Sequence, residues 1–243
     1  MTSQFKKKII YEVDKVPIGY YDKVYNRRTG VQSKWHHIKF DFVKKKMENH
    51  FVHLDYACAS GTFIHTLDQK NLSIGVDISR KQINYAKKNY QTKNHNFTVS
   101  KFPLPYKKST FDIITILELI EHCNKKQNDK IFNEVYRVLK PGGKLIITTP
   151  NYFSFWPLLE KIVNSIGQID YNEQHINFFN KKKLYDFLSK KKFDQINIET
   201  FIYFSPFLAI LSWKLSSFIA KLEQLFSKTP FGFLLCATFI KKK

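Results

Sequence analysis

The sequence is poor in the residues and runs that would mark a secreted, metal-binding or membrane-spanning protein. Its three cysteines, Cys58, Cys123 and Cys236, are far apart, so no CxxC pair is available for a metal or a redox disulfide. No apolar run is long enough to cross a bilayer, and no apolar segment follows the basic start of the chain as it would in a secretory signal. We therefore expect a cytoplasmic protein in a reducing environment.

Acidic residues are also scarce, because 20 Asp and Glu stand against 40 Lys and Arg and leave a formal charge of +20. Such a charge is typical of partners that carry anions, such as nucleic acid or a membrane surface. Four of the basic residues are arginine, which leaves 36 lysines scattered along the chain. Arginine is the residue that phosphate recognition favours, so nucleic acid is the less favoured partner.

The residues that are abundant can build a large core. Of the 243 residues, 43% are hydrophobic and 16% aromatic, which excludes a disordered chain. We find no internal repeat and no linker, and we expect a single domain over residues 1–243. Apolar runs at 51–55, 72–77, 97–99, 111–117 and 144–149 alternate with helical patterns such as 126–140 and predict a doubly wound α/β sheet. Two more strands, 196–204 and 233–240, should complete it.

Two features of the first half are typical of a nucleotide-binding unit. The first strand runs into a turn of mostly small residues, Tyr56 to Gly61, and a helix pattern follows. The second strand ends at Asp77, about 20 residues beyond the turn, where a carboxylate can accept hydrogen bonds from both hydroxyls of a ribose. The alternative role for Asp77 is that of a helix cap. Ser79 and Gln82 predict a capping box at the start of the next helix.

Four motifs occur in the order and at the spacing of a known family. They are 54–63 (LDYACASGTF), 75–79 (GVDIS), 104–112 followed by Glu118-Leu119-Ile120-Glu121-His122, and 137–143 (RVLKPGG). Over roughly residues 17–200 the sequence resembles the class I S-adenosylmethionine-dependent methyltransferases, especially the small-molecule branch similar to the enzymes of ubiquinone and menaquinone biosynthesis. The resemblance implies a Rossmann-like sheet of seven mostly parallel strands with an antiparallel last strand, and S-adenosylmethionine as cofactor.

The resemblance also implies which residues contact that cofactor. The methionine end would meet Asp55, the backbone of the turn, Leu117 and Glu118, and the ribose would meet Asp77. Ile78 and Phe102 would sandwich the adenine unless they are plain core, and Ser100 stands where the family usually has an aspartate that contacts the adenine amino group. The expected set is Asp55, Ala57, Ser60, Gly61, Asp77, Ile78, Ser100, Phe102, Leu117 and Glu118.

The turn departs from the family pattern, because Ala57 and Ala59 stand where glycines are usual. Alanine suits such a turn only where φ is negative and the ligand leaves room for a methyl group, so negative φ values are expected here. Together with Ser100, this departure leaves open a degenerate module that binds the cofactor without turnover.

Methyl transfer needs alignment and exclusion of water more than a strong acid or base. For a hydroxyl acceptor, a histidine near the cofactor could remove the proton. We expect this base to be His175, placed by Glu173 or Asn177, with His122 as the alternative. No cluster with metal-ligand spacing is found, so no metal is expected.

The leading interpretation is an enzyme that O-methylates a small, lipid-linked or glycan acceptor. The alternative is an RNA methyltransferase, which the charge motivates. The Asn/Asp-Pro-Pro-Tyr/Phe turn of base amino-methylation is absent after the fourth strand, where the chain reads 117–121 (LELIE). A Pro-Cys nucleophile for cytosine methylation is absent as well.

Segments outside the 51–150 cofactor core should form the acceptor site. Residues 1–50 are expected to act as a helical lid, with Tyr20, Tyr21 and Trp35 over the cofactor, and 151–180 and 205–230 as substrate-side insertions. An apolar stripe from Leu208 to Leu225 predicts one amphipathic helix over 207–226. It packs on the sheet as core, which is slightly favoured, or covers the acceptor site and docks on the inner face of an anionic membrane.

Overall fold

The computed structural model describes residues 16–47, 51–100, 102–160, 175–191 and 193–242. Its centre is a seven-stranded sheet with the strand order β3-β2-β1-β4-β5-β7-β6. The strands are β1 (Val52–Tyr56), β2 (Leu72–Asp77), β3 (His95–Val99), β4 (Phe111–Leu117), β5 (Leu139–Pro150), β6 (Phe193–Phe201) and β7 (Leu234–Lys241). All seven strands correspond to runs that the sequence predicts.

The sheet is parallel from β3 through β5, and β7 pairs antiparallel with both of its neighbours, β5 and β6. This confirms the Rossmann-like, mostly parallel sheet with an antiparallel last strand. The order reverses between β1 and β4, the strands on either side of which open α/β sheets place their ligands. In this pair Asp55 of β1 lies opposite Thr115 of β4.

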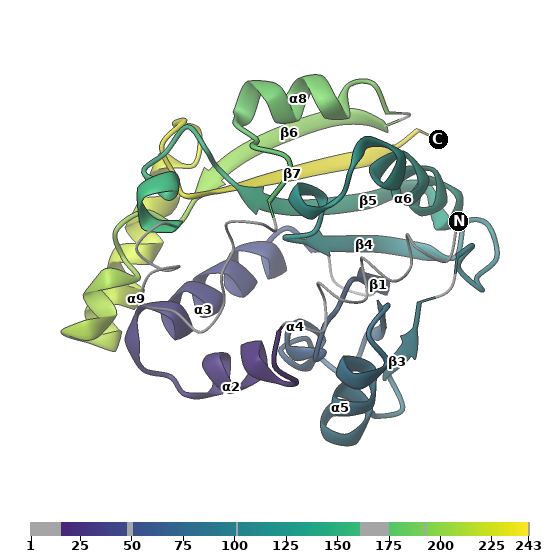
Figure 1. Cartoon of the computed structure of the whole chain (residues 1–243), viewed down its shortest axis with the longest axis horizontal. Coiled ribbons are helices and arrows are strands. Elements are labelled where there is room, and N and C mark those ends of the chain that lie inside the picture. Colours follow the sequence, from purple (N-terminus) through teal and green to yellow (C-terminus); the bar gives the residue numbers. More distant parts are fainter. Residues whose placement is uncertain (1–15, 48–50, 101, 161–174, 192, 243) are drawn as a thin grey trace.

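Helices cover both faces of the sheet (Figure 1). They are α2 (Tyr20–Asn26), α3 (Gly30–Lys44), α4 (Thr62–His65), α5 (Arg80–Tyr90), α6 (Lys125–Val138), α8 (Lys181–Leu188) and α9 (Trp213–Glu223), with short 3-10 turns η1 (Ile120–His122), η2 (Phe207–Ile210) and η3 (Gln224–Phe226). In Figure 1, α8 lies above β6, α6 lies beside β4 and β5, and α2 to α5 lie below β4.

Two apolar clusters fix these layers. Side chains of α6 and α8, such as Val135 and Leu184, pack on the sheet face that Leu54 and Ile116 present. On the opposite face, Phe42 of α3 belongs to the second cluster, with residues of β4, β5 and β7. Because the sheet is buried on both faces, its central strands are nearly continuous apolar runs, which is why the sequence locates them well.

Helix starts are built partly as predicted. The Ser79 hydroxyl caps α5 by accepting a hydrogen bond from the Gln82 amide at 3.4 Å. The Gln82 side chain accepts from the Gly19 amide instead of closing a capping box, and so ties the N-terminal segment to α5. A full capping box occurs at α6, between Asn124 and Gln127.

The helix predicted over 126–140 ends at Val138, two residues before the predicted end. The chain enters β5 at Leu139, directly after α6, and Pro141, Gly142 and Gly143 form an irregularity inside the strand rather than a loop. Gly142 has φ 74, the left-handed conformation that glycine tolerates without strain.

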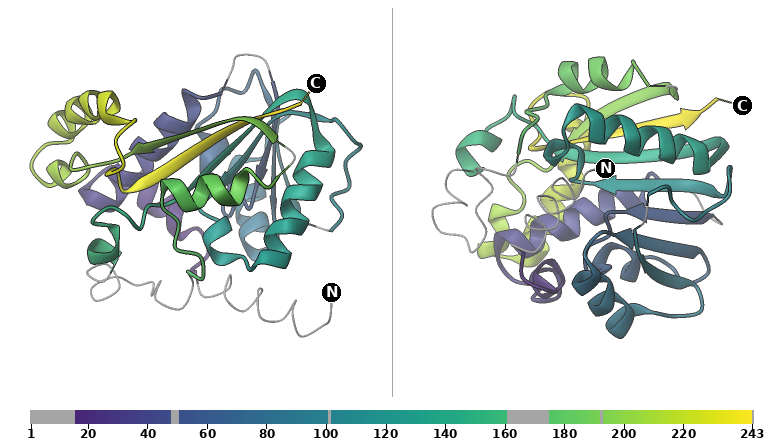
Figure 2. Two further views of the ribbon diagram at one scale, coloured as in Figure 1. Left: turned by 90° about the horizontal axis from the view of Figure 1, so that it is seen from above. Right: turned by 45° about the vertical axis from the view of Figure 1, so that its right-hand side comes forward.

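The predicted single helix over 207–226 is broken into η2, α9 and η3 (Figure 2). The break is at Ser212, whose hydroxyl caps α9 by accepting from the Leu215 amide at 3.2 Å. The predicted core packing of the stripe is also wrong, because Leu211 and Leu225 are each 79% exposed and Phe218 is 59% exposed. Within the described ranges, no helix is long and apolar enough to cross a membrane.

Candidate active site

A cavity of about 490 Å³ lies at the carboxyl ends of β1 and β4, where the strand order reverses. Its floor is the turn after β1, with Ala57, Ala59 and Ser60. One wall comes from α2 and α3, and the opposite wall from η1, Trp156, Leu159 and His175. A cavity of this size and position is typical of ligand sites in open α/β sheets.

The turn that forms the cavity floor is strained at two alanines. Ala57 has φ 67 and Ala59 has φ 45, both in the left-handed region. The prediction of negative φ values was therefore wrong. A residue with a Cβ pays roughly 1–2 kcal/mol for this conformation, so the turn keeps the shape of the family's glycine turn at a cost in stability.

At Gly61, both the backbone conformation and the nearby atoms disfavour any residue with a Cβ. The φ of Gly61 is 77, and a Cβ built on it would lie 2.5 Å from Phe97 Cε1 and 3.0 Å from the Ala86 Cβ. The glycine therefore lets α4 start close against β3 and α5. Gly61 itself does not line the cavity, unlike Ala57 and Ser60.

Asp55 is fixed in the cavity by a buried chain of hydrogen bonds. The Thr115 hydroxyl donates to Asp55 Oδ1 at 2.6 Å, and Thr115 Oγ1 lies 2.9 Å from His53 Nε2. Burial lowers the pKa of His53 to about 3, so its ring is neutral and donates to Thr115. Burial raises the pKa of Asp55 to about 7, which marks it as a group that a cation could ionise.

Asp77 lies beside the cavity and does not cap α5, because the N-cap of that helix is Ser79. Its Oδ2 accepts from the Ala59 amide at 2.9 Å, and its Oδ1 accepts from the Ser79 amide at 2.8 Å. Each carboxylate oxygen has a second lone pair, so these bonds leave capacity for ribose hydroxyls. The hydrogen bond from Ala59 holds the turn against Asp77, and the ribose role stays a prediction.

The residues expected around adenine gather at the ends of β2 and β3. The Ser100 amide donates to the Asp77 carbonyl at 2.6 Å, which places Ser100 next to the end of β2. Ile78 is 38% exposed and Phe102 is 50% exposed, so neither is plain core. The three residues lie outside the lining of the main cavity, on the side of Asp77.

The end of β4 supplies a second charged group to the cavity. Leu117 and Glu118 both line it, and Glu118 has φ 53. The Glu118 carboxylate forms an ion pair with Lys39 of α3, whose side chain is 5% exposed. This pair joins the N-terminal helices to the end of β4 across the cavity wall.

The two predicted histidines lie together on the opposite wall. The ring centroids of His122 and His175 are 4.7 Å apart, and both residues line the cavity with Glu121. His175 Nδ1 lies 2.5 Å from Glu160 Oε1, and the Tyr152 hydroxyl lies 3.1 Å from the same oxygen. The wall therefore carries a histidine-carboxylate cluster, here defined as Glu121, His122, Glu160 and His175.

Backbone contacts bring His175 to η1. The amides of Ile176 and Asn177 both donate to the Glu121 carbonyl, at 2.9 and 3.0 Å. The Asn177 side chain donates to the carbonyls of Ile120 and Cys123 at 3.1 and 2.6 Å. Asn177 thus anchors the loop beside His175, while Glu173, the other predicted helper, lies outside the described residues.

The electrostatics of the cluster favour proton sharing. Burial raises the pKa of Glu121 to about 7, although His175 opposes the shift. For His175, burial acts to lower the pKa, but the hydrogen bond to Glu160 and the charge of Glu121 outweigh it and raise the pKa. Glu121 therefore changes protonation around neutral pH, and His175 keeps its proton to a higher pH than a free imidazole does.

The cluster also has metal-binding potential that the sequence did not suggest. One ligand atom each of Glu121, His122 and His175 lie within 4.8 Å of one another. Glu121 Oε2 accepts from the Thr149 hydroxyl at 3.1 Å, and its other oxygen, Oε1, is buried without a hydrogen-bond partner. One carboxylate and two imidazoles at this spacing could hold a divalent cation.

The predicted lid residues lie on the cavity wall. Tyr20 and Tyr21 of α2 and Trp35 of α3 all line it, and Trp35 packs against Trp156 with ring centroids 5.4 Å apart. Residues 1–15 of the predicted lid lie outside the described part of the chain. Closure over a cofactor stays a prediction.

Several site residues were missed by sequence reasoning. Lys39, Glu121, Thr115 and Glu160 come from a helix, a 3-10 turn, a strand and the segment after β5, and no sequence spacing connects them. Glu121 was the one with a usable signal, because it directly precedes His122 in a motif that was already quoted.

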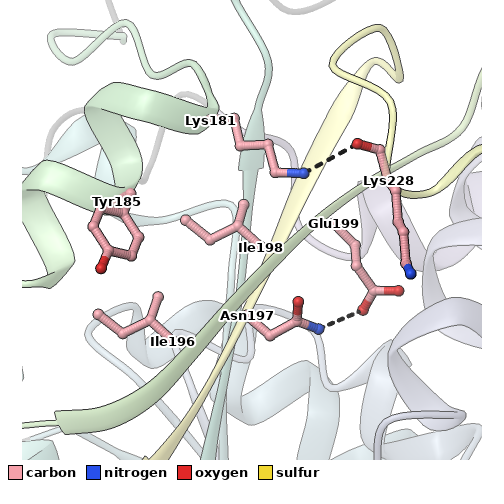
Figure 3. Close-up of a pocket in the computed structure, with 7 residues that line it drawn as sticks. All are labelled: Lys181, Tyr185, Ile196, Asn197, Ile198, Glu199 and Lys228. Carbon is pink, nitrogen blue, oxygen red and sulfur yellow. Dashed lines mark hydrogen bonds between the residues drawn. The ribbon is translucent and has the colours of Figure 1, made fainter.

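A second hollow, of about 520 Å³, lies on the edge strand β6 beside α8 (Figure 3). Asn197 donates to Glu199 at 3.2 Å, and Lys181 donates to the Lys228 carbonyl at 3.2 Å. None of the predicted site residues lines this hollow. We therefore place the chemistry in the main cavity.

Comparison with known proteins identifies a methyltransferase domain in the chain. Residues 54–147 match a methyltransferase domain family. The chain is 34% identical over 122 residues to an uncharacterised protein of Methanocaldococcus jannaschii, and the match covers 49% of this chain and 50% of that protein. It is 27% identical over 188 residues to a demethylmenaquinone methyltransferase of Lactobacillus johnsonii, covering 68% of this chain and 75% of that one.

Two further matches extend the comparison. A ubiquinone biosynthesis O-methyltransferase of Coxiella burnetii is 33% identical over 102 residues, which cover 40% of this chain and 43% of that enzyme. In structure, a possible histamine N-methyltransferase of Thermotoga maritima superposes with a TM-score of 0.68 at 17% identity, over 96% of this chain and all of that one. The ordered motifs, the fold and these matches agree: residues 54–147 form a class I S-adenosylmethionine-dependent methyltransferase domain, whose cofactor is S-adenosylmethionine.

Proposed function

We propose that the enzyme transfers the methyl group to a hydroxyl of a small acceptor that is lipid-linked or a glycan. The observation that carries this proposal is the histidine-carboxylate cluster: its members Glu121, His122 and His175 line the same cavity as the turn after β1, and Glu160 lies behind His175. A hydroxyl is a poor nucleophile until its proton is removed, so a base beside the cofactor suits an oxygen acceptor.

The residues present fit S-adenosylmethionine. Asp55 is a buried carboxylate in the cavity, suited to the ammonium of the methionine end, and the turn brings backbone groups to the same place. Asp77 keeps lone pairs for the ribose, and Ile78 and Phe102 present exposed apolar surface for adenine. When bound, the cofactor supplies a methyl group on a positively charged sulfur.

The protein would hold and move one proton. Because Glu160 accepts from His175 at Nδ1, the neutral ring carries its lone pair at Nε2. Tyr152, bonded to Glu160, holds that carboxylate in place. A neutral His175 would take the proton of the acceptor hydroxyl, while Trp35 and Trp156 keep the cavity dry.

The acceptor class rests on the matched relatives and on the cavity wall. By their names, one relative is a demethylmenaquinone methyltransferase and another is a ubiquinone biosynthesis O-methyltransferase. The lining includes the apolar residues Trp35, Phe40, Trp156 and Leu159 beside the charged ones. Such a mixed wall suits an acceptor with one hydroxylated end and one apolar end.

The test is a transfer assay with methyl-labelled S-adenosylmethionine and lipid, glycan and RNA fractions of the cells that make the protein. We expect label in the lipid or glycan fraction, on an oxygen. Label that is confined to RNA and is removed by nuclease would overturn the proposal.

The His175→Gln variant tests the base. We expect turnover to fall by roughly 10²–10⁴ while cofactor affinity stays the same. In the wild type, the rate should rise with pH and level off above the raised pKa of His175, because the protonated ring cannot accept a proton. A His175→Gln enzyme with wild-type turnover would contradict this role.

The same assay with a chelator decides whether the cluster works with a metal. The absence of metal was the expectation from the sequence, and it predicts an unchanged rate. A rate that is lost with chelator and restored by a divalent cation would show that Glu121, His122 and His175 act through a bound ion.

A further inference from the structure

An exposed apolar surface covers one end of the molecule. Figure 1 and the left view of Figure 2 place α9 and the segment 152–160 at this same end. We call this surface the apolar end face and define it by the exposed side chains Ile210, Leu211, Phe218, Leu225, Phe155 and Phe231. Large exposed apolar side chains that gather at one end of a molecule point to a binding surface.

The end face is firmly attached to the fold. Lys34 of α3 donates to the Trp213 carbonyl at 3.1 Å, and its ammonium lies 4.1 Å from the centre of the Trp213 ring. Glu223 accepts from the amides of Phe204 and Ser205 at 2.9 and 2.8 Å, which ties α9 to the chain before η2. These contacts fix α9 to α3 and to the chain before η2, so the exposed side chains of α9 keep their place on the surface.

Lysines predominate among the charges on and beside α9, although Asp41 of α3 is an exposed acid close to Lys34. Lys214, Lys221 and Lys228 are exposed on or beside α9. The acidic residue of this stretch, Glu223, points its carboxylate into the hydrogen bonds just described, and Glu160 of the neighbouring segment is 9% exposed and bonded to His175. Apolar side chains flanked by lysines, with these two acids turned inward, suit an anionic lipid surface.

Aromatic side chains join the end face to the active-site cavity. Trp156 and Leu159 line the cavity, while Phe155 and Leu158 of the same segment are exposed. The Trp35 ring contacts Phe233, with centroids 5.8 Å apart, and Phe233 contacts Phe207 of η2 at 6.2 Å. The wall of the cavity and the end face are thus connected by a continuous set of aromatic contacts.

We propose that the apolar end face docks the enzyme on anionic membrane, with Ile210, Leu211, Phe218 and Leu225 in the lipid and the lysines at the headgroups. The docking stands on the surface alone; that it serves to present a lipid-linked acceptor to the cavity rests on the proposed function. No methyl transfer is needed to observe it.

The experiment is co-sedimentation of the full chain with vesicles of phosphatidylcholine, alone or mixed with phosphatidylglycerol, without cofactor or acceptor. We expect binding that requires phosphatidylglycerol and weakens as salt is raised. Because each lysine near such a surface contributes about 1 kcal/mol, Lys214→Glu with Lys221→Glu should weaken binding by at least about tenfold. The matched control is Lys87→Glu with Lys88→Glu, two exposed lysines of α5 at another part of the molecule.

The apolar contribution is tested by Leu211→Ser with Phe218→Ser and Leu225→Ser. These side chains are exposed, so the variant should melt like the wild type and bind at least about tenfold more weakly. Trp213 is unsuitable for this test because its ring packs against His37, with centroids 5.1 Å apart. Tyr185→Ser, an exposed aromatic on α8, is the control and should leave binding unchanged.

Three results would overturn the docking proposal. The protein could stay in the supernatant with anionic vesicles at low salt, or bind neutral vesicles equally well. The triple serine variant could also abolish a dimer in solution without affecting lipid binding, which would assign the surface to a second copy of the chain. Transfer activity on a water-soluble acceptor with vesicle binding intact would contradict the proposed acceptor and leave the docking standing.

Discussion

At the scale of single residues, the turn after β1 combines backbone strain with buried charge. Ala57 and Ala59 adopt left-handed φ values, and Asp55 directly before them has a pKa raised to about 7 by burial. Both features cost stability in a protein without its ligand. Strain and unfavourable burial concentrate at functional sites, and here they lie next to each other on the cavity floor.

Replacing the strained alanines by glycine should stabilise the fold. The left-handed conformation costs a residue with a Cβ roughly 1–2 kcal/mol, while glycine loses about 0.5–1 kcal/mol in chain entropy. We expect Ala57→Gly and Ala59→Gly each to raise the free energy of unfolding by about 0.5–1 kcal/mol in urea titrations. Ala86→Gly, within helix α5, is the control and should lower it. Equal losses in all three variants would show that the turn is not strained.

Asp55 should release a proton when the cofactor binds. The carboxyl is largely protonated below its pKa of about 7, and the cofactor ammonium favours the charged form, so binding near pH 6 should free up to one proton. Calorimetry in buffers of different ionisation enthalpy measures this release. We expect a buffer-dependent binding enthalpy that Asp55→Asn abolishes. An enthalpy that is the same in every buffer would place Asp55 away from the ammonium.

Sequence reasoning found the site residues that motifs mark. Asp55, Ser60 and His175 all line the cavity. It could not find Thr115 or Lys39, because a hydrogen bond across two strands and an ion pair to a preceding helix depend on strand order and helix placement. Sequence reasoning also inferred the φ angle of Ala57 from the residue type, whereas this angle is set by the conformation of the whole turn.

At the scale of elements, α2 is held in place by one buried carboxylate. Asp22 accepts hydrogen bonds from Thr62 of α4 at 3.1 Å, and from Tyr85 and Tyr90 of α5 at 2.9 and 2.5 Å. Asp22 is 4% exposed. It therefore fixes the helix that brings Tyr20 and Tyr21 to the cavity wall.

Removing this carboxylate should loosen the lid. Hydrogen bonds to a charged group contribute about 1.5–3 kcal/mol each, and water can replace part of them. We expect Asp22→Ala to lower the free energy of unfolding by about 2–4 kcal/mol and to weaken cofactor binding at least about tenfold, as measured by urea titration and calorimetry. Asp41→Ala removes an exposed acid of α3 that pairs with Lys44, and should change neither. Unchanged cofactor affinity in Asp22→Ala would refute α2 as a lid.

Elements were predictable where burial on two faces made the pattern unambiguous. β4 was predicted at its observed bounds, because a strand inside a parallel sheet is apolar throughout. The segment 207–226 was not, because apolar residues at helical spacing read as core even when nothing covers them. Ser212 breaks the helix in this segment. Whether the apolar stripe is buried or exposed depends on the elements around it rather than on its own sequence.

At the scale of the whole molecule, aromatic side chains connect the active-site cavity with the apolar end face. The cavity lies where the strand order reverses, and the apolar end face lies beyond Trp156 and Phe233. In the proposed docking, the charge of +20 that is distributed over the chain would provide long-range attraction to an anionic membrane, and the end face would set the orientation of approach. The residues expected to bind the cofactor could be predicted from sequence motifs, whereas the candidate acceptor surface could be identified only in the structure.

The central claim is that S-adenosylmethionine binds at the ends of β1 and β2, with Asp77 at its ribose. The measurement is calorimetry of S-adenosylmethionine binding to the wild type and to Asp77→Ala. Asp77→Asn is measured as well, because it preserves an acceptor for the Ser79 amide, and a thermal melt confirms that each variant is folded. Asp68→Ala is the matched control, because Asp68 also accepts from an amide two residues on, at 2.9 Å, on an exposed loop. We predict at least about tenfold weaker binding for Asp77→Ala and none of this loss for Asp68→Ala. Equal affinity of wild type and a folded Asp77→Ala protein would contradict the account.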